Sequence, residues 1–408
     1  MKSAISVCAA VLFAFFSTGS DPLRERVLRD AAIEHGLVAP EDLAPAANAE
    51  LAALGGALFE SPLLSFNGDT SCSSCHLDRF GSADGIPVAI GVGGEGEGAA
   101  RVLSGGAIVP RNALPLWGRG APGFDRFFWD GKVELLPEGN VLSQFGWSPP
   151  SNDPLVVAAH LPVVQIREMV VDDIEVQTAY ETETVESAQQ VFAAVTRRVA
   201  DDPELGAQAA DVFSVAQNEL TFLMLAEAIA AFIRDEFQVR ESRFSRFVFE
   251  QEPLSELEVR GGLLFYGKGR CASCHTGPHF SDFEFHAVPI QQVSFGMNGF
   301  GVDYGRFNTT RSPTDRYLFR TPPLWQVAAT GPYGHAGGAS SLQEAIEAHF
   351  DPLSQLSNED WQSRDRVEFY QRLRAWAAED ASIPHLSHDE VEALAAFLHT
   401  LSFVEATD

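Results

Sequence analysis

Basic residues are scarce in this chain of 408 residues: lysine and arginine number 28, against 56 aspartates and glutamates. The resulting formal net charge of −28 makes nucleic acid an unsuitable partner, because phosphates repel an acidic surface. The acidity suits either association with a basic protein or the simple solubility of an exported one, and the composition does not choose between these two explanations.

Long apolar runs are also scarce, and the one that stands out covers residues 4–16. It begins after a single basic residue and is followed by the small residues Thr18 and Ser20, which is the pattern of a cleaved secretory signal over residues 1–20. The run is too short to span a membrane, and Cys8 lies inside it rather than at its end, which argues against a lipid anchor. We therefore expect an exported, periplasmic protein without a membrane span.

Cysteine is equally limited, with five residues in the whole chain, of which Cys8 falls in the expected signal. The other four form two copies of the pattern Cys-x-x-Cys-His: Cys72, Cys75 and His76 in the first, and Cys271, Cys274 and His275 in the second. Because both pairs belong to these motifs, we expect no disulfide in the mature protein.

Each residue of this pattern has its own chemical task. The two thiols bond the vinyl groups of a porphyrin, and the adjacent histidine becomes an axial ligand of its iron. Four thiolates could instead hold one zinc ion in a tetrahedral site. Zinc does not need a histidine directly after the second cysteine of both pairs, so the pattern favours two covalently attached c-type haems.

Hydrophobic periodicity along the chain is mostly helical. The spacing predicts helices over residues 46–59, 185–199, 220–234 and 257–266. The first and the last of these lead into the two haem motifs and both contain a Gly-Gly pair, which makes a degenerate internal repeat. We expect a mainly α protein of two cytochrome c-like domains, over residues 21–240 and 241–408, each with one covalently bound haem.

Several further motifs resemble those of one known family. They lie at residues 64–68, 111–117, 128–132, 167–169, 319–324 and 331–335. Together with the haem motifs they resemble the bacterial di-haem cytochrome c peroxidase and MauG family over nearly all of the mature chain. The resemblance implies that the haem of His76 is the peroxide site and that the haem of His275 handles electrons.

The same resemblance implies roles for three residues between the haem motifs. Glu168 matches the family's distal glutamate, which would assist cleavage of the peroxide bond. Trp129 matches the tryptophan that lies between the two haems. His160 stands where a distal glutamine is expected, so it is either a peroxide-facing acid–base group, an iron ligand, or an ordinary surface or core histidine.

Two departures from the family pattern concern the iron ligands. The loop at residues 88–94 contains no histidine, whereas the classical peroxidases carry one there that caps the peroxide iron. The first haem is therefore expected to be five-coordinate at rest, as in MauG-like members. At the second haem, the position of the family's methionine or tyrosine ligand is occupied by His349, which predicts ligation by two histidines and a lowered reduction potential.

The resemblance also implies a calcium site, formed by the side chain of Asn112 and the backbone carbonyls of Thr330 and Pro332. The expected activity is reduction of hydrogen peroxide, with a small cytochrome c or copper protein as electron donor. One alternative is a MauG-like oxidase that modifies side chains of a partner protein. Another is a di-haem electron carrier with both irons six-coordinate. The oligomeric state is left open, a homodimer included.

Overall fold

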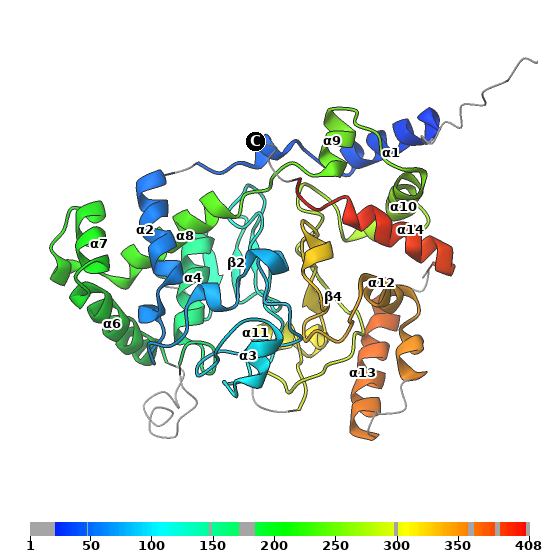
Figure 1. Cartoon of the computed structure of the whole chain (residues 1–408). Helices are drawn as coiled ribbons and strands as arrows, with labels where there is room; N and C mark the ends of the chain where they lie inside the picture. The colour runs from blue at the N-terminus through cyan, green and yellow to red at the C-terminus, as the bar shows by residue number, and fades with distance from the viewer. Residues whose placement is uncertain are drawn as a thin grey trace, which may run out of the picture.

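The protein is known here from a computed structural model, which describes residues 21–46, 48–146, 149–170, 184–297, 301–357, 363–379 and 384–404. The expected signal at residues 1–20 lies outside the described residues. The fold is mainly helical, as predicted, with two small antiparallel sheets (Figure 1). Within the described chain, no helix combines the length and apolar character that crossing a bilayer requires.

The helices of the first half are α1 (Pro22–Glu34), α2 (Ala49–Glu60), α3 (Ala99–Leu103), α4 (Pro154–Val164), α6 (Val185–Asp201), α7 (Leu205–Phe213) and α8 (Phe222–Glu236). Those of the second half are α9 (Arg243–Phe249), α10 (Glu256–Tyr266), α11 (Phe307–Thr310), α12 (Leu342–Phe350), α13 (Ser363–Glu379) and α14 (His388–His399). One sheet pairs β1 (Arg126–Phe127), β2 (Val133–Leu135) and β3 (Val141–Ser143), and the other pairs β4 (Phe285–His286) with β5 (Phe319–Arg320).

The expected helices form where local capping signals start them. The Asn48 side chain accepts a hydrogen bond from the Leu51 amide at the start of α2, and Thr221 does the same for Met224 in α8. Ser255 opens α10 with a capping box, because its hydroxyl and the Glu258 carboxylate each bond the other's backbone amide. These caps satisfy amide groups that the first turn of a helix leaves without partners.

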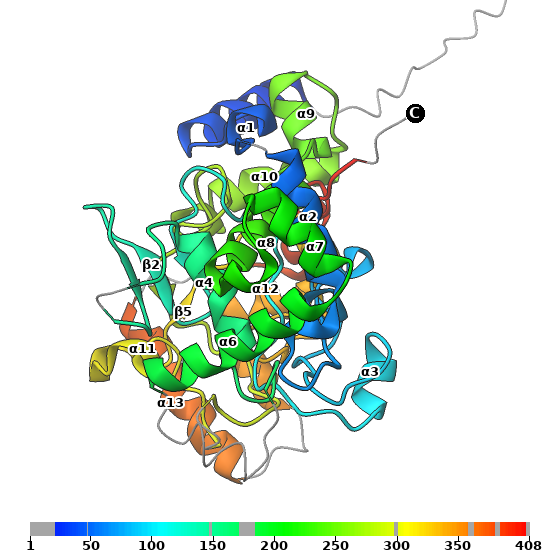
Figure 2. The same ribbon diagram turned by 90° about the vertical axis from the view of Figure 1, so that its left-hand side faces the viewer.

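The internal repeat is visible as two equivalent helix pairs. In the first half α2 packs against α8 (Figures 1 and 2), and in the second half α10 packs against α14 (Figure 1). Each pair contacts the turn that begins its haem motif. The Gly-Gly pairs lie at these crossings: a Cβ on Gly55 would stand 1.9 Å from the Ala228 oxygen, and one on Gly261 would stand 1.9 Å from the Ala393 oxygen. Glycine therefore allows the backbones to approach more closely than any side chain would permit.

Helix α1 lies with the second half of the chain, although it comes first in the sequence. It packs against α10 and α9 (Figure 1). Its Leu28 fills the space beside Gly262, where an added Cβ would meet Leu28 at 2.7 Å. One continuous apolar core includes buried residues of both halves. The division into domains at residues 21–240 and 241–408 stays a prediction. Helix α1 belongs to the first of these ranges but packs against helices of the second.

A buried ion network joins the two halves near the centre of the molecule. The Arg111 guanidinium donates to both carboxylate oxygens of Asp303, at 2.7 and 3.0 Å, and lies 2.8 Å from the Asp130 carboxylate. All three side chains are less than 9% exposed. A buried charge without its partner is strongly destabilising, so this contact holds the halves in one relative position.

The glycine crossings give a direct test of the repeat. We expect Gly55→Ala to lower the free energy of unfolding by about 1–3 kcal/mol, because the new methyl group forces α2 away from the α8 backbone. Thermal unfolding of the haem-loaded protein measures the change. Gly56→Ala is the matched control, since its Cβ meets the Phe232 ring at 3.1 Å, and a ring can move aside. Equal losses in the two variants would contradict the proposed role of close backbone contact.

Candidate haem sites

The first Cys-x-x-Cys-His motif follows α2 and begins in a short 3-10 turn, Cys72–Ser74. The ring of His76 donates from Nδ1 to the Ser82 carbonyl oxygen at 2.8 Å. Burial lowers the pKa of His76 to about 4, so the ring is neutral at physiological pH. A neutral imidazole with Nδ1 engaged in this way presents Nε2 as a metal ligand.

The second motif repeats this arrangement after α10, with a 3-10 turn at Cys271–Ser273. Here His275 donates from Nδ1 to the Phe280 carbonyl oxygen at 2.9 Å. Burial, and then the neighbouring His349, lower the pKa of His275 to about 4. The four cysteines of the motifs are not joined to one another by disulfides. Both motifs therefore offer the two thiols and the neutral imidazole that covalent haem attachment requires.

The second motif borders a mainly apolar cavity of 370 Å³. Cys271, Cys274 and His275 line one side, and His349 of α12 lines it as well. The ring of His349 donates from Nδ1 to the Ala345 oxygen at 2.7 Å, which leaves its Nε2 for another partner. His349 is exposed where it lines the open cavity, and desolvation by the surrounding protein lowers its pKa.

The spacing of the two histidine rings suits a shared metal. The ring centres of His275 and His349 are 6.4 Å apart. A metal–nitrogen bond of about 2.0–2.1 Å and a ring radius of roughly 1.1 Å together place a ring centre about 3.1–3.2 Å from the metal. Two imidazoles on opposite sides of one metal would therefore have their centres about 6.3 Å apart. Among the ring contacts of the described chain, His76 has no histidine at this distance, and its ring neighbour is Phe59. The two motifs thus differ in what stands opposite their histidines.

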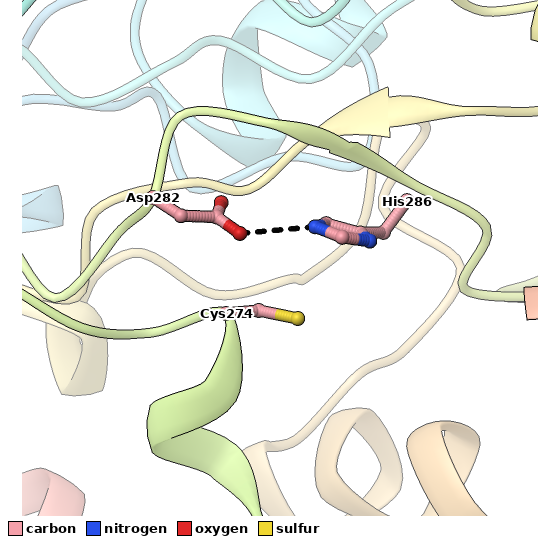
Figure 3. A group of neighbouring side chains, drawn as sticks. All are labelled: Cys274, Asp282 and His286. Carbon is pink, nitrogen blue, oxygen red and sulfur yellow. Dashed lines mark hydrogen bonds and ion pairs between the residues drawn. The ribbon is translucent and has the colours of Figure 1, made fainter. Parts of the chain in front are cut away.

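A carboxylate–imidazole pair lies beside the second motif (Figure 3). Asp282 accepts a hydrogen bond from Nε2 of His286 at 3.0 Å, and the Cys274 sulfur lies within 4.8 Å of both groups. Burial opposes ionisation of Asp282, but the bond from His286 wins and lowers the pKa of its carboxyl. Three such groups could hold a metal ion, yet attachment of a porphyrin uses the Cys274 sulfur. We therefore count Asp282 and His286 as neighbours of the haem site.

Glu168 lies close to the cysteines of the first motif. It follows α4 in a tight turn, and its negative charge helps to raise the pKa values of Cys72 and Cys75, after the larger effect of their burial. Burial raises the pKa of Glu168 itself to about 7, and the positive charge of Lys132 acts in the opposite direction. A carboxyl group with a pKa near neutrality can both accept and return a proton.

Trp129 is buried at the wall of the cavity beside the second haem motif. Its indole nitrogen donates to the Asn112 carbonyl oxygen at 3.0 Å, and its ring clusters with Leu114 and Phe319. Arg111 is the residue before Asn112. Its carbonyl oxygen accepts a backbone hydrogen bond from Ala89, in the loop beside the first motif. One short segment therefore connects the tryptophan at the second site to the loop at the first.

His160 is found in an aromatic environment. It donates from Nδ1 to the Val156 oxygen at 2.7 Å, and its ring makes edge contacts with Phe145, Phe192 and Phe222. Burial lowers its pKa, so the ring is neutral. These contacts describe a core histidine, one of the alternatives left open by the sequence. A peroxide-facing or iron-ligating role for His160 stays a prediction.

The three residues expected at a calcium site come together at the boundary between the halves. The cavity beside the second haem motif is lined by Asn112, Thr330 and Pro332. The side-chain amide nitrogen of Asn112 donates to the Pro332 carbonyl oxygen at 2.6 Å. Calcium takes six to eight oxygen ligands. The arrangement supplies neutral oxygens at one place, provided that the amide turns its oxygen toward the ion.

A sequence model of the family described as di-haem cytochrome c peroxidase matches residues 49–253 of this chain. The chain belongs to this family. Its helical arrangement also resembles the crystal structure of the diheme peroxidase BthA from Burkholderia thailandensis E264, with a TM-score of 0.63 over 90% of this chain and 89% of that one. The two sequences are 22% identical, so this likeness concerns the fold alone.

Curated relatives include both branches of the di-haem peroxidase family. The chain is 29% identical over 394 residues to the methylamine utilization protein MauG of Paracoccus denitrificans (strain Pd 1222), which covers 89% of this chain and 90% of the relative. It is 27% identical over 304 residues to the cytochrome c551 peroxidase of Nitrosomonas europaea, which covers 74% and 72%. Family membership supports peroxidase-type oxidoreductase chemistry without choosing between the two branches.

The raised pKa of Glu168 can be measured directly. We expect the carboxyl group to be protonated below about pH 7 and ionised above it, because burial disfavours the charge. Infrared difference spectroscopy as a function of pH follows the carboxylic acid band, which Glu168→Gln should remove. Lys132→Met should move the titration to higher pH, since it removes a positive charge that stabilises the carboxylate. Glu138→Gln, at an exposed glutamate, is the control, and a band that titrates near pH 4 would contradict the burial argument.

His349 provides the second test. Replacement of a histidine ligand by methionine raises the reduction potential of a haem. We therefore expect His349→Met to raise the potential of one haem in a redox titration and to leave the other unchanged. His388→Met, at an exposed histidine that begins α14, is the matched control. If His349→Met leaves both potentials as they are, His349 is not a ligand.

Proposed function

We propose that this chain reduces hydrogen peroxide to water at the site of Cys72, Cys75 and His76, with electrons that arrive through the site of Cys271, Cys274 and His275. The observation that carries the proposal is the difference between the two histidines. His275 faces a second imidazole at a metal-sharing distance, whereas His76 has none among the described residues. A glutamate with a pKa of about 7 lies near the cysteines of the His76 motif. One site is arranged to hold electrons and the other to accept a small ligand.

When bound at His76, haem supplies the iron at which the peroxide bond is cleaved. The overall reaction consumes two electrons and two protons for each peroxide and releases two water molecules. Glu168 takes a proton from one peroxide oxygen and delivers it to the other, so that the leaving oxygen departs as water or hydroxide rather than as an oxide. Its near-neutral pKa suits both directions of this transfer.

Electrons pass between the sites by way of Trp129. Its indole ring lines the cavity beside the second haem motif and donates a hydrogen bond to the Asn112 carbonyl oxygen. The neighbouring Arg111 pairs through its backbone with Ala89, in the loop beside the first motif. A conjugated ring at this position shortens the gap that an electron crosses through saturated chain. His349 and His275 are the residues that would hold the iron of the second haem. The donor is a small cytochrome or copper protein, and the net charge of −28 favours a donor with a basic surface.

A MauG-like oxidase is the second candidate. Two observations favour it: the similarity to a MauG protein over 89% of this chain, and the absence of a histidine in the loop at residues 88–94. His349 at the position of the MauG tyrosine counts against it. In that case Glu168 and Trp129 keep their roles, and the electrons come from side chains of a partner protein. A pure electron carrier would need a second ligand opposite His76.

Three further proposals follow from the same comparison. Calcium binds Asn112 together with the carbonyls of Thr330 and Pro332, which the contact between Asn112 and Pro332 supports, and it would clamp the halves of the molecule. The chain is exported to the periplasm, where haem is attached, and it loses residues 1–20. It acts there as a monomer or a homodimer.

Rapid mixing of the oxidised di-haem protein with one equivalent of hydrogen peroxide tests the proposal. We expect an immediate optical change in the native protein and a rate at least 100-fold lower in Glu168→Gln, the lower end of the usual contribution of a positioned acid–base group. Glu138→Gln should react as the native protein does.

The other outcomes separate the alternatives. If the protein reacts only after one haem has been reduced, the first iron carries a second ligand at rest. If neither oxidation state reacts, the electron carrier is the correct reading. If peroxide reacts but no small cytochrome or copper protein sustains turnover, the MauG-like oxidase is favoured.

A further inference from the structure

The loop at residues 88–94 lies between the first haem motif and Glu168. On one side, the Cys75 sulfur is 3.7 Å from the Ile90 carbonyl oxygen. On the other, Gly91 packs directly on the glutamate segment: a Cβ at Gly91 would stand 1.8 Å from the Arg167 oxygen and 2.7 Å from the Glu168 Cα. The position of Glu168 relative to the motif therefore depends on this loop.

Arg101, on α3, is buried beneath the loop with 3% of its surface exposed. All three of its guanidinium nitrogens donate to loop carbonyls. Nε reaches the Ile90 oxygen at 2.6 Å, Nη1 the Gly94 oxygen at 2.8 Å and Nη2 the Gly91 oxygen at 3.0 Å. A planar guanidinium can make these three bonds at once because its donors point in fixed directions.

Asp69 ties the same loop from a second direction. One oxygen of its carboxylate accepts the Gly93 amide at 2.9 Å, and the other accepts the hydroxyls of Ser65 and Thr70 at 3.2 and 3.1 Å. The backbone of Val92 adds a hydrogen bond to the Arg167 oxygen at 3.1 Å. A loop with three glycines among seven residues would otherwise have wide conformational freedom.

We propose that Arg101 is a positioning residue for Glu168. Together with Asp69 it holds the loop at residues 88–94 in one conformation, and the loop in turn fixes Glu168 beside the first haem. The proposal rests on the proposed peroxide chemistry and deepens it, because it names the residue that holds the acid–base group in place. With the loop held in this way, we expect the first haem to have the same surroundings in the oxidised and the half-reduced protein.

Two features explain why the loop stays in place. Movement of the loop would leave a buried guanidinium and three carbonyl oxygens without partners, and unpaired buried polar groups are costly. The loop also has nothing to offer an iron if it moved, because its side chains are those of valine, alanine and isoleucine or are absent altogether. An activating rearrangement of this loop would therefore lose bonds without gaining a ligand.

Four variants of the haem-loaded protein test the clamp. Arg101→Met removes all three bonds, Arg101→Lys keeps the charge but cannot reach three carbonyls at once, and Gly91→Ala pushes the loop off the Glu168 segment. Arg79→Met is the control, because Arg79 makes an exposed ion pair with Glu97 and leaves the clamp intact. The readouts are the EPR spectrum of the first haem in the oxidised and half-reduced protein, the pH titration of Glu168, and the rate with one equivalent of peroxide.

In the native protein and in Arg79→Met, we expect the EPR signal of the first haem to be the same in both oxidation states. In Arg101→Met and Gly91→Ala, we expect this signal to broaden or split, the Glu168 titration to shift, and the peroxide rate to fall at least tenfold. Displacement of a catalytic group by about 1 Å can cost as much as 100-fold, so this loss is well within reach. Arg101→Lys should recover only part of the rate.

A native spectrum, titration and rate in Arg101→Met would overturn the proposal, and so would full recovery in Arg101→Lys, because charge alone would then suffice. If Arg101→Met does not fold, Gly91→Ala and the milder Asp69→Asn decide by the same criteria. If the native protein ignores peroxide, the proposed function fails, and the EPR comparison and the Glu168 titration still decide whether Arg101 holds the glutamate.

Discussion

One hydrogen bond in each half of the molecule determines how the haem motifs can be used. It runs from Nδ1 of the motif histidine to a backbone carbonyl a few residues later, from His76 to Ser82 and from His275 to Phe280. The bond fixes the tautomer and directs the other ring nitrogen away from the backbone, while burial keeps the ring neutral. Without it, two thiols and an imidazole would be adjacent in sequence but not arranged as a haem site.

The two sites share this hydrogen bond, but they differ in the residues that lie around the motif histidine. Helix α12 brings His349 to the second site at a distance that suits a shared iron. Near the first motif lie a glycine-rich loop and Glu168, whose pKa is raised by burial to about 7. The buried contacts of Arg111 with Asp130 and Asp303 keep the two sites at a fixed relative position. In the proposed function, the duplicated unit would attach the haems, and the residues around each unit would give the two haems different tasks.

The sequence predicted the features that depend on neighbouring residues. The haem motifs, the helices that lead into them and the repeated Gly-Gly pairs all depend on short patterns, so their sequence signals are strong. The position of His349 could be found only through resemblance to a family, because it lies far along the chain from His275.

Other features left no readable signal. Arg101 bonds backbone oxygens, which every residue possesses, so its partners could not be deduced from side-chain types. The packing of α1 on α10 depends on Leu28 meeting Gly262, and no local pattern marks that pair. The raised pKa of Glu168 comes from burial, which a single sequence does not reveal at one isolated acid. The aromatic shell of His160 likewise depends on three distant phenylalanines.

The EPR spectrum of the fully oxidised protein tests the central claim most directly, since the claim is that one iron has a single protein ligand and the other has two histidines. The account predicts one high-spin signal and one low-spin signal, with the low-spin signal lost in His349→Ala. Two low-spin signals at rest, or a low-spin signal that survives the loss of His349, would contradict it.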